Sequence, residues 1–309
     1  MKGDKPKLFV ILGPTASGKS KLAMEIAGSL RSEIVSADSL HVYRHFDIGT
    51  AKPTVEDLES IPHHLLDIVN PEDEFNAGTF RELARRVIDD LHRSGKKIIL
   101  VGGTYLYIKV LLSGLIEDLP ADSEIRSGLK ELRAEYGTEY VYEKLKSIDP
   151  EATAKIHPND YVRAERALEV FRLTGEKMSY LQSLHEFGDR DYEYLKIGIS
   201  VDREELRLRI DRRVDKMIED RLVGEVENLR RMGYGPGLKP MQSIGYKEIN
   251  GYLDGEIGFE KAVELIKRDT KRFAKRQMTW LRRDKEITWF DLPRDYVKVL
   301  DTARDFFRE

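Results

Sequence analysis

The sequence predicts an α/β protein whose mainly parallel sheet is flanked by helices. From Leu8 to Val101, short apolar runs alternate with helix-periodic segments, the order that builds a parallel sheet. The strand pattern stops after Leu115 and returns at Tyr194, so a helical segment interrupts the sheet sequence. After Arg203 the pattern is mostly helical, which predicts a helical C-terminal region.

The strand candidates share a short apolar composition and are residues 8–12, 33–37, 64–69, 97–101, 194–199 and 287–292. The first is a continuous apolar run, which fits a strand buried on both faces. Residues 21–30 read as a helix because Leu22, Ile26 and Leu30 recur every four residues. Residues 80–91 have the same periodicity.

Residues 120–186 are helical in type, rich in charge and without a strand pattern. We interpret them as an insertion between two strands of one sheet. The predicted organisation is a discontinuous core of residues 1–116 and 190–309 with a helical insertion domain at residues 117–189. Glycines and a proline at residues 233–237 predict a loop in the C-terminal region.

The chain has 309 residues, of which 40% are hydrophobic, and no cysteine. The lack of cysteine excludes disulfides, thiolate zinc sites and cysteine nucleophiles. No apolar stretch approaches the roughly 18 residues of a membrane helix, and the N-terminus lacks the apolar region of a signal peptide. We expect a soluble, cytoplasmic and monomeric protein with no membrane partner.

A complete G-x-x-x-x-G-K-[ST] motif follows the first strand and opens the first helix. Its residues are Gly13, Pro14, Thr15, Ala16, Ser17, Gly18, Lys19 and Ser20. In such a P-loop the backbone N–H groups and the helix N-terminus surround phosphates, Lys19 reaches the outer phosphate oxygens, and Ser20 would hold Mg²⁺. The motif predicts a P-loop NTPase-like sheet and a phosphate site, but it does not say which compound carries the phosphates.

Asp38 lies at the C-terminal end of the second strand, where open α/β sheets place their ligands. Its carboxylate could orient Mg²⁺ or accept a proton; the alternative is a helix N-cap or turn role. The fourth strand ends in Gly102-Gly103-Thr104 and lacks the aspartate usual in P-loop NTPases. This counts against an ordinary ATPase motor.

Charge is segregated although the net charge is only −3. Residues 267–285 contain nine basic and two acidic residues, which could bind RNA phosphates or form a solvated face. Arg163 and Arg166 could clamp RNA or pair with nearby glutamates. Arg209 and Arg213 could likewise face phosphates or join a structural ion-pair network.

Three further features favour structural roles. The pair His63-His64 has no third ligand in view, so a metal site is not predicted there. Trp280 and Trp289 are predicted as core residues. In the basic run, Val263, Ile266, Phe273 and Trp280 are expected to form the apolar stripe.

The chain resembles the bacterial tRNA dimethylallyltransferases. The similar segments are GPTASGKS (13–20), SADSLHVYRHFDIGTAKP (36–53), HHLLDI (63–68), VGGTYLY (101–107), IHPNDYVRAERALEVF (156–171), SIGYKEI (243–249) and KRFAKRQMTWLRR (271–283). The resemblance implies transfer of a dimethylallyl group from dimethylallyl diphosphate to N6 of the adenine 3′ to the anticodon, and a Mg²⁺ requirement. Tyr105 departs from the family's GGTGLY form at a variable position. We expect no zinc-finger extension of the kind that eukaryotic members have, which fits the lack of cysteine.

By position, the resemblance implies that the P-loop holds the donor diphosphate and that Asp38 is the general base. Thr104 and Arg126 match positions that touch the substrate nucleotide or diphosphate. The insertion and the basic run match segments that contact the tRNA anticodon stem-loop. The implied tRNA contacts are Asp38, Ser39, Leu40, His41, Val162, Arg163, Ala164, Glu165, Arg166, Lys271, Arg272, Lys275, Arg276 and Gln277.

Two other functions use the same features. A small-molecule or nucleoside kinase would bind ATP in the P-loop and use Asp38 as base for a hydroxyl, but the basic C-terminal region would have no role. A non-catalytic RNA-binding switch would leave Asp38 at the ligand edge unexplained.

Overall fold

The computed structural model describes residues 4–114, 119, 121–184 and 191–308. The chain forms two compact units, one of Met1–Leu112 with Arg190–Glu309 and one of Ser113–Asp189. The domain boundaries predicted after residues 116 and 189, and both ends of the helical segment predicted at 120–186, fall outside the described residues.

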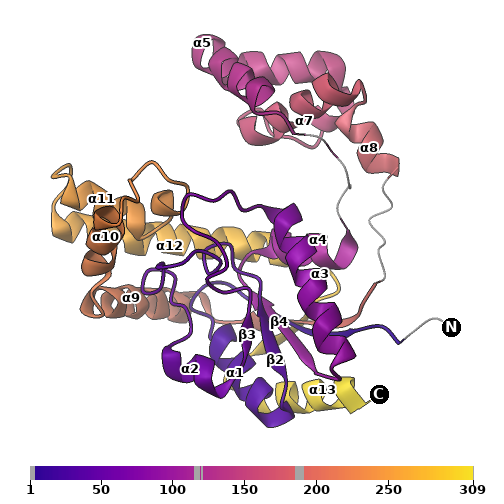
Figure 1. Cartoon of the computed structure of the whole chain (residues 1–309), viewed down its shortest axis with the longest axis vertical. Helices are drawn as coiled ribbons and strands as arrows, with labels where there is room; N and C mark the ends of the chain where they lie inside the picture. The colour runs from indigo at the N-terminus through magenta and orange to yellow at the C-terminus, as the bar shows by residue number, and fades with distance from the viewer. Residues whose placement is uncertain (1–3, 115–118, 120, 185–190, 309) are drawn as a thin grey trace. The chain divides into compact units, whose positions relative to one another are not determined.

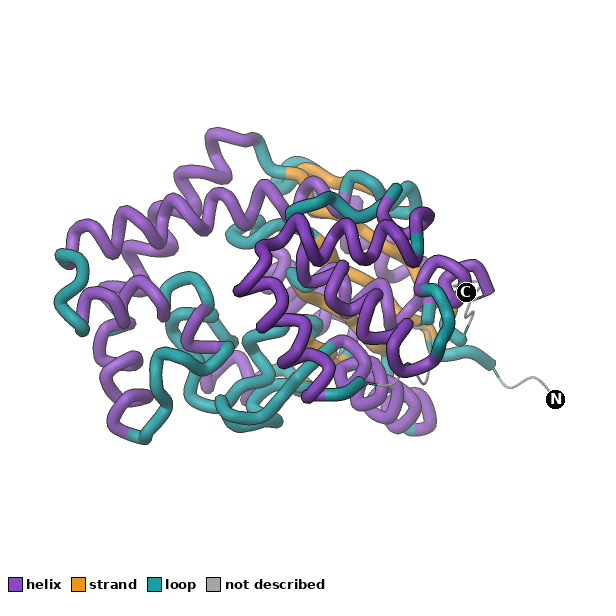
Figure 2. Tube along the Cα trace, turned by 90° about the horizontal axis from the view of Figure 1, so that it is seen from above, coloured by secondary structure: helices purple, strands orange, loops and turns teal. Residues whose placement is uncertain are grey.

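The first unit is built on a six-stranded sheet of order β3-β2-β4-β1-β5-β6 (Figure 1). Its strands are β1 (Lys7–Leu12), β2 (Glu33–Ser36), β3 (His63–His64), β4 (Ile98–Gly102), β5 (Glu193–Ser200) and β6 (Thr288–Asp291). All neighbouring pairs are parallel, and Figure 2 shows the strands side by side with helices around them. The predicted α/β fold class is confirmed. Because β5 pairs with β1, the second unit interrupts one sheet.

Helices cover both faces of this sheet. The helices of the first unit are α1 (Lys19–Leu30), α2 (Val55–Ser60), α3 (Ala77–Arg93), α4 (Tyr105–Ser113), α9 (Arg203–Glu219), α10 (Leu222–Arg231), α11 (Tyr246–Leu253), α12 (Phe259–Leu281) and α13 (Tyr296–Arg308), with a 3₁₀ turn at Pro240–Gln242. Leu8 and Val10 of β1 pack in a core with α3 and α4, whereas Phe9 and Ile11 pack in a core with α1 and α13. The continuous apolar run thus makes a strand buried on both sides, as predicted.

The second unit has its own helical core. Its helices are α5 (Ser123–Ile148), α6 (Pro150–Thr153), α7 (Tyr161–Thr174) and α8 (Met178–Leu184). Leu129, Leu145 and Leu168 are among the residues that pack together there. Buried Asp149 accepts hydrogen bonds from the amide of Ala152 (3.0 Å) and the hydroxyl of Ser179 (2.6 Å), so one carboxylate joins α6 to α8.

Two local predictions are wrong. The third strand was expected at residues 64–69, but β3 contains only His63–His64. Leu65 and Asp67 have φ angles of 64° and 54°, and these left-handed conformations turn the chain out of the sheet. Phe273 and Trp280 were expected in the apolar stripe of α12, yet they are 38% and 42% exposed.

The core face of α12 is instead formed by Ala262, Ile266, Ala274, Gln277 and Leu281. In the part of the chain that the structure describes, no helix combines the length and apolar character needed to cross a membrane.

Candidate active site

The ends of β1, β2 and β4 bring the P-loop, Asp38 and Thr104 to one edge of the sheet. The β2 and β4 ends approach closely, because the amide of Ala37 donates to the carbonyl of Val101 (2.7 Å) and that of Thr104 donates to the carbonyl of Ala37 (3.2 Å). Gly102 permits this approach: a Cβ at Gly102 would lie 2.1 Å from the Ala37 oxygen. Glycine is therefore required beside the turn that carries Asp38.

The P-loop opens the N-terminus of α1 toward a ligand. Gly18, the residue before the helix, has φ 93°, a conformation that favours glycine. The helix has no side-chain cap and no acidic residue in its first turn. Its N–H groups and dipole therefore remain available to an anion.

Lys19 lies between opposing charges. Its Nζ is 3.4 Å from the carbonyl oxygen of Pro14. Burial and the positive charge of Arg213 lower the pKa of Lys19 to about 8, against the opposite effect of Asp38. A bound anion would relieve this unfavourable environment, so Lys19 is suited to binding phosphate.

Asp38 forms a turn and does not cap a helix. Its Oδ1 accepts the amide N–H of Leu40 at 2.9 Å. Burial alone would raise the pKa of Asp38. The positive charge of His41 when protonated, the Leu40 hydrogen bond, and the charges of Lys19 and Arg213 outweigh it and hold this pKa below its usual value. At neutral pH, where His41 is neutral, the last three causes remain. Asp38 is therefore an ionised carboxylate at neutral pH.

Thr104 supports the turn that follows Asp38. Its Oγ1 accepts the amide N–H of Ser39 at 3.0 Å and donates to Ser39 Oγ at 3.2 Å. The structure thus brings three of the predicted site residues, Asp38, Ser39 and Thr104, together across the ends of β2 and β4.

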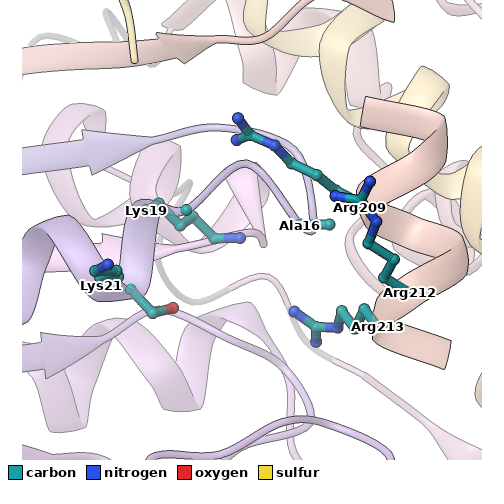
Figure 3. A pocket seen from close by; sticks show the side chains of 8 residues that line it. Ala16, Lys19, Lys21, Arg209, Arg212 and Arg213 are labelled. Carbon is teal, nitrogen blue, oxygen red and sulfur yellow. The ribbon is translucent and has the colours of Figure 1, made fainter. Parts of the chain in front are cut away.

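An open pocket of about 430 Å³ adjoins the P-loop. Its lining residues are Ala16, Gly18, Lys19, Ser20, Lys21, Arg209, Arg212 and Arg213. Figure 3 shows Lys19 and Arg213 pointing into the space between α1 and α9 from opposite sides. The sequence leaves Arg213 with two interpretations, phosphate binding or a structural ion-pair network, and does not single out Arg212. The spacing of basic residues on α9 is the signal that could have found them.

A carbonyl group holds Arg213 in place. One nitrogen of its guanidinium donates to the oxygen of Thr50 at 3.2 Å. His41 Nε2 lies 3.2 Å from the same oxygen, and Nδ1 lies 3.3 Å from Ser36 Oγ. A carbonyl can only accept, so Nε2 carries a proton and Nδ1 accepts from Ser36. Burial lowers the pKa of His41, which keeps this neutral form.

The loop that supplies the Thr50 carbonyl is fixed by Glu225 of α10. The Glu225 carboxylate accepts the amide N–H groups of Asp47, Ile48 and Gly49 at 3.0, 2.7 and 3.1 Å. It also accepts the hydroxyl of Tyr246 at 2.6 Å. This network holds the loop 47–50 against the helices, so the position of Arg213 depends on a rigid support.

The basic residues of α12 fall into two classes. Lys271 pairs with Asp211 at 2.6 Å and Arg272 with Asp269 at 3.4 Å. Lys275 and Arg276 are exposed, and no acidic group of the described residues lies within 4.0 Å of either. The solvated ion-pair interpretation therefore fits the first two residues and the phosphate-binding interpretation fits the last two.

The predicted residues of the second unit are largely paired. Arg126 and Arg166 bind the two oxygens of Glu169 at 2.8 and 2.6 Å. Arg163 pairs with Asp160 at 3.3 Å and Glu165 with Arg133 at 2.6 Å.

The first turns of α7 present the remaining predicted residues of this unit. Val162 is 63% exposed. Ala164 was predicted as a tRNA contact, but it is 1% exposed inside the helical core, so its side chain is not available to tRNA. Val162 and Ala164 differ in exposure because α7 buries one side, with small residues such as Ala164, and exposes the other.

Gln277 also differs from its prediction as an RNA contact. It is 6% exposed, and its side chain bonds the P-loop and Gly103. The two histidines at 63 and 64 have structural partners, the carbonyl of Ile61 and the carboxylate of Glu33, both at 2.8 Å.

The fold and this site define a P-loop α/β protein with a cationic pocket beside a carboxylate. The family model described as IPP transferase matches residues 41–284. The chain belongs to this family.

Close relatives and solved structures agree. The chain is 50% identical to tRNA dimethylallyltransferase 2 of Geotalea uraniireducens (strain Rf4) over 98% of both chains. It is 38% identical to the tRNA isopentenylpyrophosphate transferase structure from Bacillus halodurans, with a TM-score of 0.72, covering 98% of this chain and 97% of that one. A eukaryotic dimethylallyltransferase acting on tRNA is 28% identical, with a TM-score of 0.82, covering 98% and 79%.

Proposed function

We propose that this enzyme transfers a dimethylallyl group from dimethylallyl diphosphate to N6 of the adenine 3′ to the anticodon in tRNA, releasing diphosphate. One observation carries the proposal. Lys19, Arg213 and the N-terminus of α1 converge on a pocket beside an ionised Asp38, in a chain of the IPP transferase family. The arrangement offers cations to a leaving diphosphate and a carboxylate to a nucleophile.

The leaving group requires the cations. The bond between the allylic carbon and the diphosphate oxygen breaks, and its electron pair stays with the diphosphate. The P-loop N–H groups, Lys19 and Arg213 stabilise this developing negative charge because they are already oriented toward the pocket.

Mg²⁺ fits the oxygen chemistry of the pocket. It prefers oxygen ligands and is commonly held by one or two protein oxygens together with substrate phosphates and water. Ser20 lines the pocket and could offer its hydroxyl oxygen to the ion. When bound, Mg²⁺ would neutralise part of the diphosphate charge.

Asp38 completes the reaction on the acceptor side. As N6 of adenine bonds to the allylic carbon, it must lose a proton, and the Asp38 carboxylate accepts it. Lys19 and Arg213 depress the pKa of Asp38. Bound diphosphate offsets their charges and so makes Asp38 a stronger base after donor binding.

The tRNA reaches this site through the basic surface of α12 and the first-unit turn 38–41. Lys275 and Arg276 bind backbone phosphates. The target adenine leaves its stack to reach Asp38. From the insertion, Arg126 contacts the substrate nucleotide or diphosphate, and Val162, Arg163, Glu165 and Arg166 contact the anticodon stem-loop.

The kinase alternative finds no support among the matched relatives and structures, whose names describe tRNA transferases. Incubation with unmodified tRNA and labelled dimethylallyl diphosphate, and separately with ATP, tests the proposal. We expect labelled N6-modified adenosine next to the anticodon after nuclease digestion. Phosphate transfer from ATP without allyl transfer would contradict the proposal.

A further inference from the structure

Gln277 joins two loops of the proposed active site. Its Oε1 accepts the amide N–H of Thr15 in the P-loop at 2.8 Å, and its Nε2 donates to the carbonyl of Gly103 at 2.9 Å. An amide N–H can only donate and a carbonyl can only accept, so these partners fix the orientation of the carboxamide. One buried side chain therefore spans the loops that follow β1 and β4.

The loop at Gly103 adjoins both reactive groups. A Cβ at Gly103 would lie 2.7 Å from Gln277 Nε2, 3.7 Å from Asp38 Oδ2 and 3.8 Å from Lys19 Nζ. The Gln277 amide, the proposed base and the phosphate lysine thus surround one backbone position. A shift of Gly103 or Thr15 would change the separation between the diphosphate cradle and Asp38.

The two sides of α12 have different surroundings near this residue. Ala274, Gln277 and Leu281 are buried, whereas Lys275 and Arg276 are exposed. The helix that presents cations to solvent thus braces the P-loop with its opposite face. Gln277 lies on the inner face, where it touches protein backbone and not the tRNA surface.

We infer that Gln277 is a positioning residue that aligns the P-loop with Asp38 for allyl transfer. This inference rests on the proposed function. Loss of alignment slows the chemical step, since a misplacement of about 1 Å can cost on the order of 100-fold in rate. It leaves the binding of each substrate nearly unchanged, because the groups that hold diphosphate and tRNA remain.

Gln277→Met tests this inference because methionine has a similar length and no hydrogen-bonding amide. At saturating tRNA and dimethylallyl diphosphate we expect the single-turnover rate to fall about 10- to 100-fold. Affinities for inorganic diphosphate and for tRNA should change less than about 3-fold. Gln242→Met is the control, because the exposed Gln242, at the end of the 3₁₀ turn, also donates from its amide to a backbone carbonyl, that of Pro236. It should keep the native rate.

Gln277→Glu adds a readout that loss of packing would not change. Its carboxylate can still accept from Thr15 but opposes the Gly103 carbonyl. Once protonated, it can donate to that carbonyl. The rate of Gln277→Glu relative to native should therefore rise as pH falls from about 8 to about 6, because burial raises a carboxyl pKa. Gln277→Met should show no such recovery.

The outcomes separate the two proposals. A native-like single-turnover rate in both Gln277 variants would overturn the positioning role and leave the proposed function intact. Loss of tRNA affinity with a native rate at saturation would make Gln277 an RNA contact and also overturn it. If Gln277→Met does not fold, Gln277→Glu decides by its pH profile. Absence of allyl transfer by the native enzyme would refute the proposed function itself.

Discussion

Two arginine sites, one in each unit, are held in opposite ways. In the helical insertion, Arg126 and Arg166 both bind Glu169, whose side chain is 1% exposed. In the core, Arg213 donates to the neutral carbonyl of Thr50, and no carboxylate of the described residues lies within 4.0 Å of it. An arginine neutralised by an acid stabilises the fold around it. An arginine held by a dipole keeps its positive field for a ligand.

The largest expected effect is at Asp38 in the core unit, the carboxylate on which the charges of Lys19 and Arg213 act. Asp38→Asn keeps the size of the side chain and cannot accept a full proton. We expect the single-turnover rate to fall by about 10²- to 10⁴-fold, because proton acceptance is lost in the transition state. Affinities for inorganic diphosphate and tRNA should change far less.

Two other roles for Asp38 would give different results. A role in holding Mg²⁺ predicts weaker diphosphate binding and partial rescue at raised Mg²⁺. A turn role alone predicts near-native turnover with a lower melting temperature. Either pattern, measured across Mg²⁺ concentrations beside a thermal melt, would exclude Asp38 as the base.

Paired methionine substitutions sharpen the comparison. Arg213→Met should weaken binding of inorganic diphosphate by about 10- to 100-fold, because a charge-assisted contact is lost. It should hardly change the melting temperature. Arg166→Met should leave diphosphate affinity unchanged and lower stability by about 1 kcal/mol, since the arginine is partly exposed and Arg126 still binds Glu169. Calorimetry and thermal melts on both variants measure the contrast. Equal effects of the two variants on diphosphate binding would remove the distinction.

The sequence predicts the positions of the P-loop and of Asp38 in the fold because their determinants are local. A strand, a glycine-rich turn and a helix follow one another at the P-loop, and Asp38 directly follows β2, so neighbours in sequence become neighbours in the site. The same locality fails for His64 to Val69. There, Leu65 and Asp67 adopt left-handed conformations. Aspartate tolerates this conformation, but nothing in the residue type of Leu65 indicates it.

Contacts between distant segments could not be predicted in the same way. Arg213 meets Thr50, and Gln277 meets Thr15 and Gly103, only after the sheet has formed. Gln277 was grouped with the exposed basic run. Its spacing of three residues from Ala274 and four from Leu281 does place it on the core face of α12, so periodicity could have corrected the assignment.

Basic residues with and without an acidic partner can also be compared within the single helix α12. If Lys275 and Arg276 contact RNA phosphates, replacing both by alanine should lower the slope of log affinity against log salt by about 0.7–0.9 for each charge. Lys271 and Arg272 are already paired with Asp211 and Asp269, so their double alanine variant should change the slope less. Filter binding of unmodified tRNA over a salt series measures both slopes. Equal changes in the two slopes would show that the ion pairs of Lys271 and Arg272 do not reduce their contribution to RNA binding.

The smallest expected effect is a pH dependence of donor binding that arises from Lys19. Its pKa is lowered to about 8 by burial and by Arg213, so the free protein loses this positive charge as pH rises through about 8. Diphosphate binds the protonated form and raises the Lys19 pKa in the complex. Between pH 8 and pH 9 the affinity should therefore fall, by less than about tenfold. Lys19→Arg stays protonated throughout this range, and the ratio of native to variant affinity cancels the ionisation of diphosphate itself. Calorimetry with inorganic diphosphate from pH 7 to pH 10 should show this ratio decreasing above pH 8. A constant ratio would mean that Lys19 remains charged in the free protein. The neighbouring positive charges of the pocket would then not disfavour the protonated form of Lys19, and this difference from the neutralised arginines at Glu169 would disappear.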